Sequence, residues 1–250
     1  MIVNRDPKVR GPSTAFADVA AAYERGRPGY PEAAVRWLVG SEPRDVVDLG
    51  AGTGKLTRSL VALGHRVTAV EPLDEMRAVL VQAVPGLRTL SGSAEAIPLE
   101  DGTVDVVTSA QAFHWFDRER ALPEIVRVLR PGGRLALAWN SRDDRDPWMS
   151  RLSAIIGNET VRDDDVVPAL AASGLFGPVE KEQFSFEQVL DRDGLLDLVL
   201  SRSYLAKLPP AEREPVLDAV AALYDETAGP GGVDLAYVTE CFRTHTRGAA

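Results

Sequence analysis

The chain has 250 residues, of which 45% are hydrophobic and 26% are charged, so its composition is that of a globular protein with a sizeable core rather than a disordered one. Its 28 Lys and Arg residues against 37 Asp and Glu residues give a net charge of −9, which argues against nucleic-acid and anionic membrane partners, because both need a basic surface. The single cysteine, Cys241, cannot form an internal disulfide. No apolar run approaches the ~18–20 residues of a membrane-spanning helix, and residues 1–10 lack the apolar stretch of a signal peptide. We therefore expect a cytoplasmic monomer or homodimer.

The first 140 residues alternate between helical and strand patterns. Residues 16–38 predict one or two helices, broken around Pro28 and Pro31. Short apolar runs then predict strands at 46–49, 66–70, 87–90, 104–108 and 134–139, and helical periodicity predicts helices at 55–63, 74–84 and 118–129. Strands and helices that alternate in this way indicate an α/β fold with a doubly wound, parallel sheet, which binds ligands at the carboxyl ends of its strands.

The second half of the chain is richer in helices. Residues 141–174 are polar and read as helical, 179–186 and 234–243 as strands, 191–205 and 210–227 as helices, and 244–250 as a loose tail. We interpret 1–250 as a single domain. Its parts are entry helices at about 1–40, a ligand-binding core at about 45–140, a helical cap in two insertions at about 141–176 and 187–230, and closing strands at 177–186 and 234–243.

A glycine-rich loop joins the first strand of this core to the next helix. Its sequence is Asp-Leu-Gly-Ala-Gly-Thr-Gly-Lys over 48–55, and three alternating glycines let the backbone turn tightly and approach a ligand. A phosphate-binding P-loop is disfavoured, because Leu49 and Leu56 stand where that motif needs Gly and Ser or Thr. A dinucleotide-binding loop is disfavoured because Lys55 stands where its third glycine belongs. A structural turn rarely needs three glycines and an acid together.

The loop resembles the first motif of the class I S-adenosylmethionine (SAM) methyltransferases, in which an acidic residue precedes G-x-G-x-G. Further stretches resemble that family in the expected order: Glu71 with Pro72 after the second strand, 92–99, 105–108 and the turn at 127–135. The resemblance implies a Rossmann-like, mostly parallel, seven-stranded sheet with an added helical cap, and SAM as the cofactor. Residues 16–31, 110–117 and 201–204 resemble a small-molecule subgroup similar to trans-aconitate methyltransferases, which implies a natural product or carboxylate-type metabolite as the acceptor.

The same resemblance assigns the site. The residues expected to bind SAM are Tyr23, Arg27, Asp48, Gly50, Ala51, Gly52, Gly54, Glu71, Pro72, Met76, Ser93, Ala94, Glu95 and Ala110. Within this set Glu71 would hold the ribose hydroxyls, Met76 and 93–95 would bound the adenine, and Tyr23 and Arg27 would reach the cofactor carboxylate. Gln111, His114, Trp115 and Tyr204 would contact the acceptor, and His114 is the candidate general base, because the unperturbed imidazole group titrates near neutrality.

Some alternatives stay open at this level. A SAM-binding enzyme of another chemistry, such as cyclisation of SAM, a nucleotide-dependent oxidoreductase and a non-catalytic SAM sensor share the same fold features. We expect no metal site in the run Asp163-Asp164-Asp165, because three consecutive carboxylates cannot all point at one ion.

Overall fold

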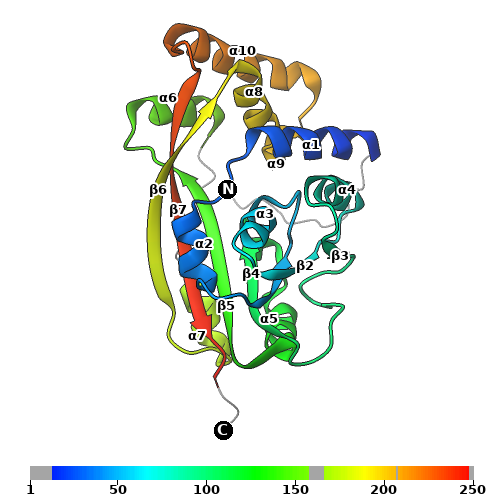
Figure 1. The fold of residues 1–250 in the computed structure, drawn as a ribbon. Coiled ribbons are helices and arrows are strands. Elements are labelled where there is room, and N and C mark those ends of the chain that lie inside the picture. The colour runs from blue at the N-terminus through cyan, green and yellow to red at the C-terminus, as the bar shows by residue number, and fades with distance from the viewer. Residues whose placement is uncertain (1–12, 158–165, 207, 248–250) are drawn as a thin grey trace.

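The computed structural model describes residues 13–157, 166–206 and 208–247. Within these residues, seven strands form one sheet in the order β3-β2-β1-β4-β5-β7-β6 (Figure 1). β1 to β5 pair in parallel with one another, and β7 runs antiparallel between β5 and β6, so that six of these seven strands share one direction. The strands are β1 (Asp45–Leu49), β2 (Arg66–Val70), β3 (Arg88–Leu90), β4 (Val104–Ala110), β5 (Leu129–Arg142), β6 (Glu180–Leu190) and β7 (Val233–His245). The predicted fold class, an α/β doubly wound and mostly parallel sheet, is confirmed.

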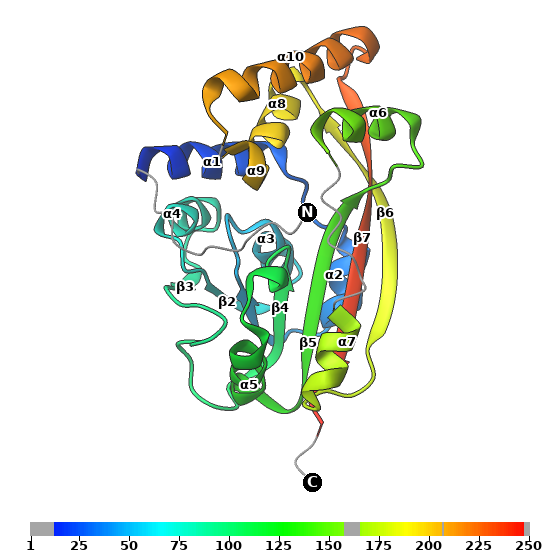
Figure 2. The same ribbon diagram turned by 180° about the vertical axis from the view of Figure 1, so that it is seen from behind.

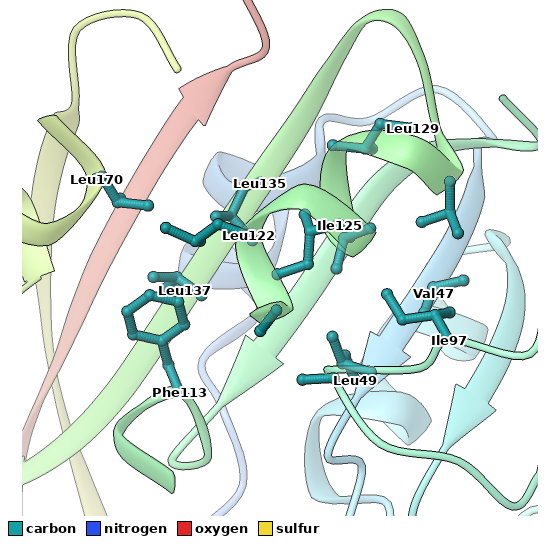
Figure 3. Close-up of a cluster of buried hydrophobic side chains, with 14 of the residues drawn as sticks. Val47, Leu49, Ile97, Phe113, Leu122, Ile125, Leu129, Leu135, Leu137 and Leu170 are labelled. Carbon is teal, nitrogen blue, oxygen red and sulfur yellow. The ribbon is translucent and has the colours of Figure 1, made fainter. Parts of the chain in front are cut away.

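Helices cover both faces of the sheet (Figures 1 and 2). On one face α2 (Glu32–Val39) and α3 (Lys55–Ala62) pack against alternate strand residues such as Val46. On the other face α5 (Arg118–Val128) and α7 (Val166–Ser173) pack against Val47 and Leu135, and Figure 3 shows this cluster. Neighbouring strand residues point to opposite faces, so a strand buried on both sides reads as a continuous apolar run. The helix α4 (Asp74–Ala83) follows β2.

A second hydrophobic cluster lies beyond the carboxyl ends of β1 and β4, at one end of the molecule. It joins α6 (Pro147–Ile156), α8 (Arg192–Leu200), α9 (Ser203–Ala206) and α10 (Pro210–Thr227) to the extended ends of β6 and β7. The buried side chains shared by these elements include Met149, Leu195, Val220 and Leu235. We call α6, α8, α9 and α10 the cap.

The first helix, α1 (Ser13–Gly26), lies between the cap and the sheet (Figure 1). It crosses α8 very closely at Gly26, where an added Cβ would lie 2.2 Å from the backbone nitrogen of Leu198. An ion pair of 2.5 Å between Arg25 and Asp197 joins the same two helices. On the sheet side, Lys55 Nζ donates to the Glu24 carbonyl at 2.5 Å. The end of α1 is therefore fixed between α3 and the cap.

Several element boundaries differ from the sequence predictions. The fifth and seventh strands are longer than expected, because β5 and β7 pair with each other from Arg134 and His245 as far as Arg142 and Tyr237. Residues 141 and 142 are therefore strand rather than helix. The sixth strand continues to Leu190 because β7 pairs with it throughout.

Two helical predictions also change. The helix expected at 191–205 is two helices, α8 and α9, and α7 packs on the sheet, outside the cap in which the segment 141–176 was placed. The Asp163–Asp165 run and residues 1–10 lie outside the described residues. No helix in the described part of the chain is long and apolar enough to cross a bilayer.

Candidate cofactor and acceptor site

The glycine loop turns from β1 into α3 with positive φ angles at its three glycines. The φ angles are 69° at Gly50, 57° at Gly52 and 90° at Gly54, a region that side chains disfavour. A Cβ at Gly50 would lie 2.7 Å from the Cβ of Ala112, and a Cβ at Gly54 would lie 2.3 Å from Cδ1 of Leu80. A Cβ at Gly52 would meet no atom within 4 Å. Gly50 and Gly54 thus allow close packing inside the protein. Gly52 faces open space, so a ligand can approach its backbone closely.

Asp48 lies at the base of the loop and is 1% exposed. Its carboxylate accepts hydrogen bonds from Thr57 Oγ1 at 2.5 Å and from Thr108 Oγ1 at 3.0 Å. Burial raises the pKa of Asp48 to about 6, and the two hydroxyl donors oppose that rise. Thr57 and Thr108 were not among the predicted site residues, and neither has a sequence signal of its own, because they come from α3 and β4.

Glu71 follows β2 directly and is 5% exposed. Its two carboxylate oxygens accept the Gly52 amide at 2.9 Å and the Leu73 amide at 3.0 Å. Burial raises the pKa of Glu71, and these two amides oppose the rise. The predicted pair of glycine loop and acidic residue therefore comes together in space. Next to it, Pro72 is exposed and Met76 is half-buried on the first turns of α4.

The segment 93–95 follows β3 and contacts the start of α5. Ala94 is buried in the sheet cluster, and Ser93 makes a bridge with Ala96. Glu95 accepts the Asp117 amide at 2.9 Å. Partial burial acts to raise the pKa of Glu95, but the bonds from Asp117 and Ser93 outweigh it and lower that pKa. In this conformation Glu95 stabilises the turn that leads into α5.

The end of β4 bends sharply after Ala110. Gln111 has a positive φ of 56°, the one such non-glycine residue in the described chain. Strained backbone of this kind gathers at functional sites. Gln111 Nε2 donates to the Asn140 carbonyl at 2.9 Å, and Asn140 Nδ2 donates to the Gly29 carbonyl at 2.9 Å. A hydrogen-bonded chain thus joins the ends of β4 and β5 to the segment after α1.

The aromatic residues that follow Gln111 separate into two environments. Phe113 is fully buried and packs edge-on against Phe116 and Trp139 at 5.7 and 6.4 Å between ring centroids. Trp115 is 68% exposed, and its ring lies 4.7 Å from that of His114. Phe113 is therefore part of the core, Trp115 is exposed, and His114 is half-buried beside it.

Tyr23 and Arg27 reach the site from the last turn of α1 and the residue after it. The Arg27 guanidinium lies 5.5 Å from the centre of the Tyr23 ring, and its Nε donates to Ser201 Oγ at 2.8 Å. Burial raises the pKa of Tyr23, the charge of Arg27 opposes that rise, and the charge of Glu71 adds to it. Tyr204 is farther into the cap, where its hydroxyl donates to the Ile156 carbonyl.

A separate hollow of about 1070 Å³ lies at the opposite end of the sheet, lined by Asp45, Arg66, Arg88 and Val104 at the amino ends of the strands. Doubly wound sheets bind ligands at the carboxyl ends of their strands. The glycine loop, Glu71 and the cap are all at that end, so we place the functional site there.

Comparisons with known proteins agree with this geometry. Residues 47–137 match the model of a methyltransferase domain. The chain is 46% identical over 239 residues to an uncharacterized methyltransferase of Mycobacterium tuberculosis, covering 94% of this chain and 96% of that protein. It is 37% identical over 239 residues to an uncharacterized methyltransferase-like protein of Schizosaccharomyces pombe, covering 91% and 93%.

A solved structure has the same fold at low sequence identity. A phosphoethanolamine N-methyltransferase of Haemonchus contortus, in complex with phosphomonomethylethanolamine and S-adenosylhomocysteine, superposes with a TM-score of 0.57 at 17% identity, over 93% of this chain and 58% of that one. The chain belongs to the class I SAM-dependent methyltransferases. It is an enzyme, and SAM is its cofactor.

The residues around the glycine loop fit this cofactor. SAM carries a cationic sulfonium, an ammonium group and two ribose hydroxyls. The open side of Gly52 leaves room for it, the buried carboxylate of Glu71 binds the Gly52 amide beside that space, and the buried carboxylate of Asp48 lies at the base of the same loop.

Proposed function

We propose that the protein transfers the methyl group of SAM to a small-molecule acceptor, a natural product or a carboxylate-type metabolite. The observation that supports this most is that the cap and α1 lie over the carboxyl ends of the parallel strands (Figure 1). The cap has its own hydrophobic cluster and is tied to the core through Gly26, Arg25 and Lys55. Helices that cover the site in this way leave access to a small acceptor more readily than to a macromolecule. The net charge of −9 also disfavours RNA.

In this proposal the loop and its neighbours orient the cofactor. Glu71 binds the ribose hydroxyls, Asp48 keeps the loop in place, and the backbone of 50–54 lies against the methionine part. Met76, Pro72 and 93–95 bound the adenine, and Ala110 lies at the end of the adjoining strand. When bound, SAM supplies an activated methyl group, so the protein contributes orientation and the exclusion of water more than acid–base chemistry.

The acceptor would lie between the end of β4 and the cap. Gln111, His114 and Trp115 would line the β4 side and Tyr204 the cap side. His114 would take the proton of an acceptor O–H or N–H if one is released, because an imidazole titrates near neutrality. Positioning alone can provide several kcal/mol, up to ~7–11 kcal/mol in ideal intramolecular cases, so a general base is not required for activity.

The decisive experiment supplies SAM labelled in its methyl group together with a metabolite extract and the full chain. A methyl transferase produces S-adenosylhomocysteine and a labelled small molecule in equal amounts. Release of a cyclised SAM fragment, with no labelled acceptor, would instead identify SAM cyclisation. Tight binding of NAD without binding of SAM, measured by calorimetry, would identify an oxidoreductase.

A further inference from the structure

The connection between α1 and α2, residues 27–31, is bound to the sheet by side-chain amides. Its two prolines have no backbone N–H, so they cannot donate to the sheet. Two amides of the sheet donate to this part of the chain instead. Gln188 Nε2 of β6 donates to the carbonyl of Gly26, the last residue of α1, at 3.0 Å, and Asn140 Nδ2 of β5 donates to the Gly29 carbonyl at 2.9 Å. The position of the end of α1 therefore depends on these two amides.

The Asn140 carboxamide is held in one orientation by Thr239. The two residues lie directly opposite each other in the antiparallel pair of β5 and β7. Thr239 is fully buried, and its Oγ1 donates to Asn140 Oδ1 at 2.7 Å. Because the amide oxygen accepts this bond, the amide nitrogen is directed to Gly29.

The backbone of Asn140 binds the turn on the acceptor side of the proposed site. Gln111 Nε2 donates to the Asn140 carbonyl at 2.9 Å, and the Gln111 backbone N–H donates to the Ala138 carbonyl at 3.0 Å. Gln111 has a φ of 56°, a conformation that costs free energy in a residue with a side chain. The two bonds to β5 stabilise this conformation.

Three hydrogen bonds therefore meet at Asn140, at the carboxyl end of the sheet. Ala138, two residues earlier, pairs with Ala110, the last residue of β4, so Asn140 lies just beyond the end of that strand. Its side chain binds the connection that follows α1, and its backbone binds Gln111. One residue thus links the helix expected to cover the cofactor with the turn expected to contact the acceptor.

We propose that Asn140 is a positioning residue for methyl transfer, which keeps the end of α1 and the Gln111 turn at a fixed separation so that cofactor and acceptor are aligned. This inference rests on the proposed function, because Gln111 lies in the proposed acceptor site. Asn140 acts through Gly29 and Gln111. In-line transfer needs a close and aligned approach of the reacting atoms, and a displacement of about 1 Å can lower the rate about a hundredfold.

The Asn140→Asp variant of the full chain tests the link to α1. A carboxylate keeps the shape of the side chain and the bond from Thr239, but it has no N–H to donate, and its oxygen then faces the Gly29 carbonyl. We expect S-adenosylhomocysteine to bind about fivefold or more weakly in calorimetry, the effect of losing one hydrogen bond. We also expect at least a tenfold lower rate of methyl transfer from labelled SAM at saturating SAM.

Two threonine variants separate positioning from stability, and they serve if Asn140→Asp does not fold. Thr239→Val removes the hydroxyl that orients the Asn140 amide and should weaken binding of S-adenosylhomocysteine severalfold. The matched control is Thr244→Val on the same strand, because Thr244 is also buried and its hydroxyl donates to the Gly177 carbonyl at 3.0 Å. Both variants should lose similar stability in urea, but Thr244→Val should bind S-adenosylhomocysteine and transfer methyl groups like the wild type.

The outcomes distinguish this inference from the proposed function. If Asn140→Asp and Thr239→Val bind S-adenosylhomocysteine like Thr244→Val, or transfer methyl groups at the wild-type rate, Asn140 is not a positioning residue. If the wild type labels no small molecule, the proposed function fails. The comparison of S-adenosylhomocysteine binding then still decides whether Asn140 positions the end of α1.

Discussion

Replacing the buried Asp48 by Asn should make the protein more stable at neutral pH and remove part of its pH dependence. Asn has nearly the same shape and can accept a bond from one of Thr57 and Thr108 while donating to the other. What the substitution removes is a charge that burial makes unfavourable. Raising this pKa from 3.8 to about 6 corresponds, at ~1.36 kcal/mol for each pH unit, to about 3 kcal/mol.

The direction of this pH effect on stability follows from proton binding. Because the folded state holds the Asp48 proton more tightly than the unfolded state, the contribution of this group to stability is greatest below about pH 4. It falls as the pH rises from about 4 to about 6 and is then constant. The free energy of unfolding of Asp48→Asn, relative to wild type, should therefore increase by up to about 3 kcal/mol between pH 4 and pH 7.

Urea denaturation across this pH range measures the difference directly. The matched control is Asp45→Asn at the other end of the same strand. The pKa of Asp45 is lowered, chiefly by the hydrogen bond from Arg66. The contribution of Asp45 to the free energy of unfolding is therefore present at neutral pH and is lost on acidification, which is opposite to the behaviour of Asp48. A difference between Asp48→Asn and wild type that does not vary with pH would refute the reasoning.

Three further predictions concern the loop and the cap. Glu71→Ala should weaken SAM binding, measured by calorimetry, at least tenfold, because the Glu71 carboxylate binds the glycine loop. The control Glu75→Ala should leave SAM binding nearly unchanged. Equal affinities of the two variants would contradict the assignment of Glu71 to the ribose. Gly54→Ala should cost about 2–4 kcal/mol of stability in urea, because its Cβ would lie 2.3 Å from a packed side chain at a φ of 90°. Gly86→Ala, with a φ of 81° but nothing within 4 Å, should cost only about 1–2 kcal/mol, and equal losses would contradict the packing argument. Gly26→Ala should lower the melting temperature and weaken SAM binding, because a Cβ 2.2 Å from the α8 backbone would push α1 away from the cap. An unchanged melting temperature would show that α1 and α8 are not tightly packed at Gly26.

The sequence alone was sufficient for the fold class and the cofactor. Apolar runs and helical periods along 45–140 predicted all five parallel strands and the helices between them, because burial on a sheet or a helix face imposes a local repeat. The glycine spacing of 50–54 predicted the turn, because positive φ angles and close packing exclude a Cβ there. Glu71 was also placed correctly beside this loop, since the ends of adjacent parallel strands meet at one edge of the sheet.

Contacts between distant parts of the chain were decided only by the tertiary structure. The lengths of β5 and β7 depend on their pairing with each other, and neither segment carries that information in its own pattern. The threonines that bind Asp48 come from a helix and another strand. Arg27 and Ser201, which are hydrogen-bonded at the junction of α1 and the cap, are 174 residues apart in the sequence. A local sequence pattern indicates how buried a side chain is. Which polar and charged side chains contact one another depends on how the strands and the cap helices pack, and the proposed acceptor site depends on that packing.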